Sequence, residues 1–228
     1  MIAPPRQRGR PREFDRDKAL ESAMRLFWSR GYEATSISDL TKAMQITPPA
    51  LYSAYGDKKR LFLETVGRYE HSAGCFAQKA LTEEPTAELA IRRLLLDAVK
   101  SFADPKNPKG CLIVLGATNC AIESTDIFEA LAERRSAAEN VVRARIAAGQ
   151  KAGELSANAD IDALTGVVTA TLYGLAIKAR DGAPRARLQT IVDQLMMMWP
   201  RRELDEADAA RRTGVSSLAR RASSPRGG

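Results

Sequence analysis

The sequence is poor in the residue types on which small catalytic and metal-binding sites depend. Its 228 residues include one histidine, His71, and three cysteines, none of them in a Cys-x-x-Cys pair. An odd number of cysteines without paired spacing argues against a disulfide framework and against a zinc site. A single histidine leaves little for histidine-based catalysis or metal chelation. We therefore expect no metal, no cofactor and no catalytic residue.

The chain also lacks the long apolar runs of membrane and secreted proteins. No uninterrupted apolar run approaches the roughly 18 residues that span a bilayer, and the charged N-terminus has no apolar segment behind it. Glycine-rich phosphate loops, nucleophile elbows and paired catalytic carboxylates are missing as well. These absences predict a cytoplasmic protein that is not an enzyme and has no membrane partner.

Charge is spread unevenly along the chain. Residues 1–60 hold 12 basic and 7 acidic side chains, residues 201–228 hold 7 and 4, and the middle of the chain is close to neutral. A basic end on a neutral body suggests a module that binds a polyanion such as nucleic acid. Two solvated basic ends without a partner are the alternative.

Hydrophobic periodicity predicts short helices in the N-terminal quarter of the chain. Asp15 can cap the first helix, and Gly31 can end it. Ser36 with Asp39 forms a capping-box pattern, and Thr47 before two prolines is typical of an N-cap. The predicted helices are 15–31, 36–44, 48–55 and 57–80. Short helices with such brief breaks have the spacing of a helix-turn-helix unit.

The remainder of the chain is predicted to form longer helices. They cover 86–102, 111–121, 126–151, 160–180 and 187–199. The segment 111–121 is almost wholly apolar, so we expect it to be a buried helix. Because no segment of useful length has the period of a β-strand, the predicted fold class is all-α.

The N-terminal quarter contains a series of characteristic stretches, which are GRP at 9–11, AMRLF at 23–27, RGYEATSI at 30–37, ITPPALYSAYGDK at 46–58 and LF at 61–62. In these stretches it closely resembles the DNA-binding domain of the TetR family of bacterial transcriptional regulators. One departure lies in the turn before the third helix, where Gln45 stands at a place that usually holds a small residue or glycine. If that turn needs a left-handed residue, glutamine costs about 1 kcal/mol relative to glycine.

The resemblance implies a repressor that a small-molecule effector releases from a double-stranded DNA operator. The third helix would enter the major groove, anchored by Ile46 and Leu51, with Ala54 among its outward residues. An extended arm with arginines suits a narrow minor groove, although an arm without specific contacts is the alternative. The expected DNA-contacting residues are Arg10, Arg12, Thr35, Ser36, Thr47, Pro48, Ala50, Tyr52, Ser53, Tyr55 and Lys58.

Several of these residues have a simpler structural interpretation. Thr35 and Ser36 can cap the second helix, and Tyr55 can be a core aromatic that closes the domain. Tyr52 is the better candidate for a phosphate contact, and Lys58 lies in the first turn of the fourth helix, where an anion is favoured. The small residues of the third helix favour base recognition by close approach, thymine-methyl contact and water.

For the body, the resemblance implies a homodimer and an effector pocket. The helices at 160–180 and 187–199 are expected to pair with those of a second copy in a four-helix bundle, and both helices being internal is the alternative. The pocket is expected between the fifth and eighth helices, although each candidate can equally be plain core. These pocket candidates are Phe76, Phe102, Cys111, Leu115, Cys120, Phe128 and Tyr173.

Two other functions stay open. A thiol-based redox sensor could use Cys111 and Cys120, but on one helix, nine residues apart, they would face opposite sides, as buried structural cysteines can. A non-sensing architectural DNA-binding protein could use both basic ends. The predicted organisation is a flexible basic arm at 1–12, a helix-turn-helix DNA-binding domain at 13–66, an effector-binding and dimerisation domain at 67–200 and a disordered tail at 201–228.

Overall fold

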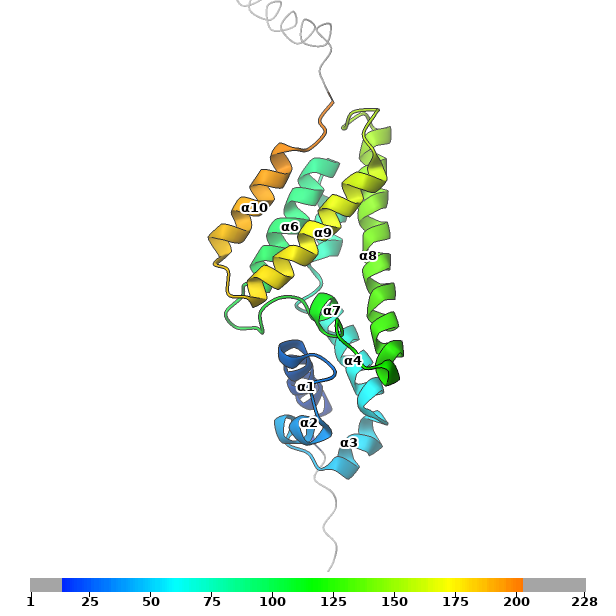
Figure 1. Ribbon diagram of the computed structural model, residues 1–228, viewed down its shortest axis with the longest axis vertical. Helices are drawn as coiled ribbons and strands as arrows, with labels where there is room; N and C mark the ends of the chain where they lie inside the picture. The colour runs from blue at the N-terminus through cyan, green and yellow to red at the C-terminus, as the bar shows by residue number, and fades with distance from the viewer. Residues whose placement is uncertain (1–13, 203–228) are drawn as a thin grey trace, which may run out of the picture.

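The computed structural model describes residues 14–202, and every regular element in that part of the chain is a helix. Three short helices, α1 (Arg16–Arg30), α2 (Ile37–Met44) and α3 (Pro48–Tyr55), form one end of the molecule, and α4 (Lys58–Glu70) leads from them into the body (Figure 1). This confirms the predicted all-α fold. The predicted arm at 1–12, with Arg10 and Arg12, and the tail from residue 203 lie outside the described residues.

The body contains the remaining elements. They are α5 (Phe76–Glu83), α6 (Ala87–Phe102), α7 (Leu112–Leu115), the short 3₁₀ helix η1 (Ile122–Ser124), α8 (Thr125–Lys151), α9 (Ile161–Arg180) and α10 (Arg185–Met197). Helix α6 packs against α5, α8, α9 and α10, so it forms the centre of the body. The long α8 runs along one side toward the N-terminal helices, and α7 lies between the two parts (Figure 1).

The N-terminal helices begin where the sequence predicts, because each has a side chain that caps its first turn. Asp15 accepts from Lys18 N, Thr47 accepts from Ala50 N, and Asp57 accepts from Arg60 N. Ser36 and Asp39 form a reciprocal capping box. These local hydrogen bonds define the helix boundaries without help from distant parts of the chain.

The turn between α2 and α3 has the strained geometry that the sequence suggests. Gln45 lies in the left-handed region, with φ 57° and ψ 40°, and it is the one non-glycine residue with positive φ among residues 14–202. A side chain in this region costs roughly 1–2 kcal/mol. The turn therefore keeps its conformation at some expense of stability.

Two predicted helices are shorter in the structure. The helix predicted over 57–80 ends at Glu70, and α5 begins after a turn in which Gly74 N donates to Tyr69 O over 2.8 Å. A Cβ at Gly74 would lie 2.7 Å from the Tyr69 ring, so glycine allows this close approach. The helix predicted over 111–121 is reduced to α7, because Gly116 O accepts from Tyr32 N instead of continuing the helix.

The ordered body extends beyond the boundary predicted at residue 200. Arg201 forms an ion pair with Glu88 on α6, and its backbone forms an antiparallel bridge with Leu155. The start of the predicted tail is thus attached to the body. Two long-range contacts hold it there, and neither partner is near Arg201 in the sequence.

Candidate functional site

Helix α3 presents a small, mostly polar face to solvent at the end of the molecule farthest from α10 (Figure 1). Leu51 is fully buried and anchors the helix, and Ile46 is half-buried against the same core. Ala54 is also half-buried against the core rather than facing outward, which corrects the sequence expectation. The exposed or partly exposed residues of this face are Thr47, Pro48, Ala50, Tyr52 and Ser53.

Tyr52 is the large side chain of this face, and 49% of it is exposed. It lies one position beyond the buried Leu51, so the anchoring of α3 holds Tyr52 outward. A hydroxyl at such a place can reach a phosphate oxygen or a base edge.

Two predicted DNA contacts are wrong, because their side chains are internal. Thr35 is fully buried, and its hydroxyl donates to Gly31 O over 2.7 Å. Tyr55 is buried, and its hydroxyl donates to Arg16 O over 3.0 Å, so it closes the N-terminal core as the simpler interpretation held. Ser36 is exposed and caps α2 through Asp39.

Lys58 occupies the first turn of α4, but its ammonium lies over the Tyr32 ring, 4.1 Å from the centroid. Burial lowers the pKa of Lys58, and the Glu33 carboxylate partly offsets that effect. Burial also raises the pKa of Tyr32 to about 12. To reach a phosphate, the Lys58 side chain must leave this ring.

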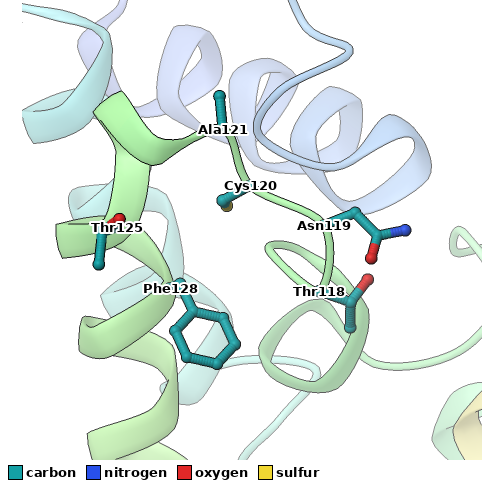
Figure 2. A pocket seen from close by; sticks show the side chains of 6 residues that line it. All are labelled: Thr118, Asn119, Cys120, Ala121, Thr125 and Phe128. Atoms are coloured by element: carbon teal, nitrogen blue, oxygen red, sulfur yellow. The ribbon is translucent and has the colours of Figure 1, made fainter.

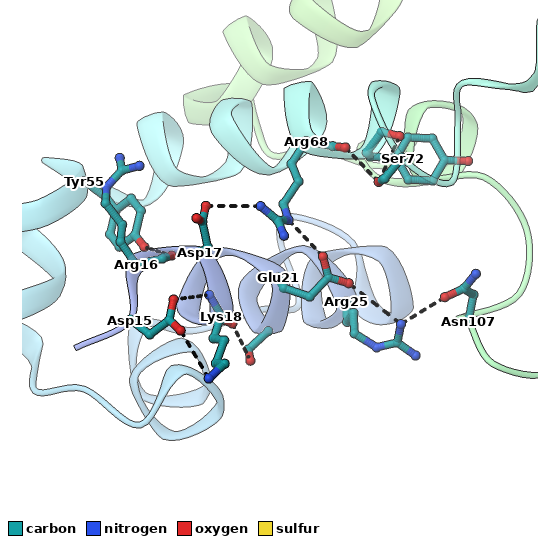
Figure 3. A network of polar contacts seen from close by, with 12 residues as sticks. Asp15, Arg16, Asp17, Lys18, Glu21, Arg25, Tyr55, Arg68, Ser72 and Asn107 are labelled. Atoms are coloured by element: carbon teal, nitrogen blue, oxygen red, sulfur yellow. Dashed lines mark hydrogen bonds and ion pairs between the residues drawn. The ribbon is translucent and has the colours of Figure 1, made fainter.

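A network of ion pairs fastens α1 to α4 (Figure 3). Arg68 contacts Glu21 at 2.9 Å and Asp17 at 3.4 Å. At the other end of the interface, Arg16 contacts Glu64 at 2.7 Å. Sequence patterns do not reveal these pairs, since the partners are more than 45 residues apart in the sequence. Together they hold α4, the link to the body, against the helix-turn-helix unit.

The body contains a cavity of about 350 Å³ between α4, α5, α6, α7, α8 and α9. Its wall is mainly apolar and aromatic, and Phe76 and Phe102 meet edge to face there, with ring centroids 5.7 Å apart. Four of the predicted pocket residues line it, namely Phe76, Phe102, Cys111 and Tyr173. A cavity of this size is at the small end of the range for ligand sites.

The other three pocket candidates do not line this cavity. Leu115 packs near Gly110, where an added Cβ would lie 2.6 Å from Leu115 Cδ1. Cys120 and Phe128 line a separate surface hollow after α7, with Thr118, Asn119, Ala121 and Thr125 (Figure 2). For Cys120, the reason is that 111–121 is not one continuous helix, since α7 ends at Leu115.

The cavity also has charged lining residues that were not among the predicted pocket residues. Arg134, Arg135 and Glu139 all line it from α8, and Glu70 lines it from α4. A partial signal was present in the sequence, because Arg135 and Glu139 are four residues apart and therefore lie on one side of a helix. Which side faces the cavity is decided by the packing of α8.

The two cysteines of the redox alternative lie in different surroundings. Cys111 is buried at the cavity and accepts a hydrogen bond from the Tyr69 hydroxyl over 3.4 Å. Cys120 lies in the surface hollow. Burial raises the pKa of both thiols, which lowers the fraction of reactive thiolate at neutral pH.

The segment around α7 joins the cavity to the N-terminal unit. Gly116 O accepts from Tyr32 N over 2.7 Å, and Gly110 O accepts from Trp28 Nε1 over 3.2 Å. Tyr69, which lines the cavity and bonds Cys111, also meets the Trp28 ring edge to face at 4.8 Å. A change in the cavity wall can therefore reach α1 through directly touching groups.

Helix α9 carries an apolar surface that this chain does not cover. Val167 and Ile177 are 49% and 48% exposed. An added Cβ at Gly166 or Gly174 would meet no atom within 4 Å. Within residues 14–202, α9 is also the one helix long and apolar enough to cross a membrane, at a mean hydropathy of 1.3. Because α9 packs against α6, α8 and α10, it is part of the helical body.

Comparisons with known proteins agree with both parts of this architecture. Residues 19–65 match the bacterial regulatory proteins of the tetR family, and residues 87–195 match the tetracyclin repressor-like C-terminal domain. The chain is 32% identical over 196 residues to the HTH-type transcriptional repressor ComR of Escherichia coli K12, across 86% of this chain and 93% of ComR. It is 26% identical over 176 residues to the repressor BdcR of the same organism, across 76% and 83%.

A solved structure extends the comparison to a complex with DNA. The fold matches a cysteine mutant of the TetR family regulator CifR complexed with 26-bp double-strand operator DNA, with a TM-score of 0.80. The two chains are 38% identical, and the match covers 84% of this chain and all of that one.

A helix-turn-helix unit on an α-helical body, with these relatives, defines a DNA-binding transcriptional regulator. The chain belongs to the TetR family of bacterial regulators. Proteins of this family act on transcription and are in general not enzymes.

Proposed function

We propose that this protein is a homodimeric repressor that a small molecule releases from its operator, and that it works in the cytoplasm, where bacterial DNA lies. The observation that carries the proposal is the capped, solvent-facing α3, coupled through α4 and α7 to a cavity in the body. A short exposed helix held at a fixed angle is what major-groove recognition requires.

On the DNA side, α3 supplies the contacts to bases. Thr47, Pro48, Ala50 and Ser53 are small, so they allow close approach to base edges and thymine methyl groups. Tyr52 and the exposed Ser36 are suited to phosphate oxygens. Arg10 and Arg12 stay candidates for the minor groove, and Lys58 joins the phosphate contacts once it leaves the Tyr32 ring.

The dimer forms through α9 and α10. The exposed Val167 and Ile177 together with the open glycines at 166 and 174 support close packing against a second copy of α9. A dimer presents two α3 helices, and it thereby reads two half-sites at a set spacing. An effector in the cavity shifts α7 and α4, changes that spacing and weakens operator binding.

The experiment is operator selection followed by a binding titration at one fixed salt concentration. Specific DNA is expected to bind at least about a thousandfold more tightly than random DNA. Tyr52→Ala is expected to weaken specific binding more than tenfold without lowering the melting temperature. Equal affinity for specific and random DNA would instead favour the architectural alternative.

Lys58→Ala tests whether Lys58 contacts a DNA phosphate. If Lys58 leaves Tyr32 to reach a phosphate, the variant weakens binding to every sequence, and the slope of log K against log salt falls by about one. Arg60→Ala, at an exposed neighbour in the same turn, is the matched comparison. An unchanged slope in Lys58→Ala would assign this residue to the Tyr32 contact alone.

The redox alternative has a separate test. Because both thiols have a raised pKa and line different hollows, Cys111→Ser and Cys120→Ser are expected to keep operator binding and to show the same oxidant sensitivity as the wild type. If the wild type responds to an oxidant and both variants lose that response, the thiol-sensor hypothesis would be favoured instead.

A further inference from the structure

The cavity has two kinds of wall, and the polar part lies along α8 and α9. Phe76, Phe102 and Leu94 belong to the apolar part. Tyr173 on α9 and Glu139 on α8 are polar residues that line the same cavity, and Glu139 also lines a second hollow with Arg143 and Asp162. A ligand that fits both kinds of wall is largely apolar and carries a polar group at one end.

The two arginines of the cavity are already engaged. Arg134 contacts Glu70 at 3.5 Å and donates to Ala130 O over 2.9 Å. Arg135 donates to Ile113 O over 2.9 Å, and its guanidinium lies 5.7 Å from the centre of the Phe128 ring. Their hydrogen bonds therefore serve the protein itself.

Tyr173 and Glu139 differ from the arginines in this respect. Within residues 14–202, neither the Tyr173 hydroxyl nor the Glu139 carboxylate forms a hydrogen bond with another group. Burial and the nearby Glu139 carboxylate raise the pKa of Tyr173, so its hydroxyl stays a donor at neutral pH. A donor and an acceptor thus face the cavity together.

The charges around the cavity are balanced, so a ligand of either sign gains no net attraction from them. Two cations, Arg134 and Arg135, stand against two anions, Glu70 and Glu139. An anionic ligand would have to approach Glu139, and a cationic one would have to approach both arginines, each at a cost that an apolar setting increases. A neutral group that both donates and accepts satisfies Glu139 and Tyr173 without that cost.

We propose that the effector is a neutral, compact and mainly apolar molecule with a hydroxyl group, which donates to Glu139 and accepts from Tyr173. The apolar body fills the space beside Phe76 and Phe102. This inference rests on the proposed function, since it names the chemical class of the effector of that same cavity.

A matched series of probes tests the class. 1-Octanol, octanoate and octylammonium share one chain and differ in the charge of the end group. In the full-length protein, octanol is expected to raise the melting temperature. The two charged probes are expected to need an at least about tenfold higher concentration for the same shift in melting temperature, because burying an unpaired charge is costly.

Two variants locate the binding group. Tyr173→Phe and Glu139→Ala are each expected to weaken octanol binding about three- to tenfold, the loss of one hydrogen bond. Glu133→Ala, at an exposed position of α8 outside the cavity lining, is expected to bind as the wild type does. The midpoint of thermal unfolding without probe shows that each variant is folded.

The outcomes separate this inference from the proposed function. Tighter binding of a charged probe, absence of octanol binding, or wild-type affinity in both cavity variants would overturn the hydroxyl assignment. Octanol binding that depends on Tyr173 and Glu139 but leaves operator affinity unchanged would support the ligand class and overturn effector release.

Discussion

The helix-turn-helix end and the cavity of the body are built from contacts of different range. In α1 to α3, each helix start is held by a side chain three residues from the N–H that it caps. The cavity wall is drawn from six helices, from Tyr69 on α4 to Tyr173 on α9. Local contacts define where the helices of the DNA-facing end begin, whereas the cavity depends on how the whole body packs.

The two parts also differ in how their polar groups are used. Around α1 and α4, the ion pairs of Arg16 and Arg68 join the helix-turn-helix unit to α4, and Figure 3 shows those of Arg68. In the cavity, Tyr173 and Glu139 face the space between helices. The first part holds one geometry, whereas the second, under the proposed function, is the part that responds to a bound effector.

The largest expected effect comes from removing the buried side chain that anchors α3. Leu51→Ala removes a fully buried side chain under α3, which is expected to cost about 2–5 kcal/mol of unfolding free energy. Operator binding is expected to fall with it. Urea denaturation measures the stability. Ala50→Gly, on the exposed side of α3, serves as the comparison, because it changes helix propensity without removing a buried side chain. A loss below about 1 kcal/mol would mean that α3 is held by other contacts.

The next effect tests whether the body acts through a second copy. Gly174→Leu adds a side chain where this chain leaves open space, so the folded monomer is expected to persist while the dimer weakens. Operator affinity is expected to drop about thirtyfold or more, because one half-site is lost. Sedimentation velocity measures the oligomeric state.

Gly67→Leu is the matched control for this change. It is also a helical glycine whose added Cβ meets no atom within 4 Å, but it lies on α4. A Gly174→Leu protein that stays dimeric would move the interface away from this face of α9.

A smaller effect tests the local character of the N-terminal unit. Ser36→Ala removes one half of the capping box on α2, and it is expected to lower stability by about 1 kcal/mol. Ser36→Thr, which keeps the hydroxyl, is expected to recover most of the loss. If the alanine variant is as stable as the wild type, tertiary packing rather than the cap defines the start of α2.

The smallest effect concerns the turn before α3. Gln45→Gly relieves the left-handed conformation, but glycine also loses more entropy on folding, so the expected net gain is about 0.5–1 kcal/mol. Gln45→Ala, which has a Cβ like glutamine, is expected to give no such gain. Differential scanning calorimetry compares the three proteins, and equal stability of the glycine and alanine variants would show that the turn is not strained.

Much of the DNA-binding domain can be predicted from the sequence, and the two wrong contact predictions there have a clear physical reason. The caps at Asp15, Ser36, Thr47 and Asp57 are local, so a sequence pattern is enough to find them. Thr35 and Tyr55 were misassigned as DNA contacts, because a polar side chain with an internal carbonyl partner looks the same in sequence as one that faces DNA.

By itself, the sequence determined the all-α fold, the family and the boundaries of the recognition helix, since these rest on periodicity, caps and turns within a few residues. Only the tertiary structure decided where α4 and α7 end, that Lys58 lies on Tyr32, and that Cys120 and Phe128 lie apart from the cavity. The reason is physical. The hydrogen bond from Tyr32 N to Gly116 O and the choice of which α8 face is covered depend on partners that are distant along the chain.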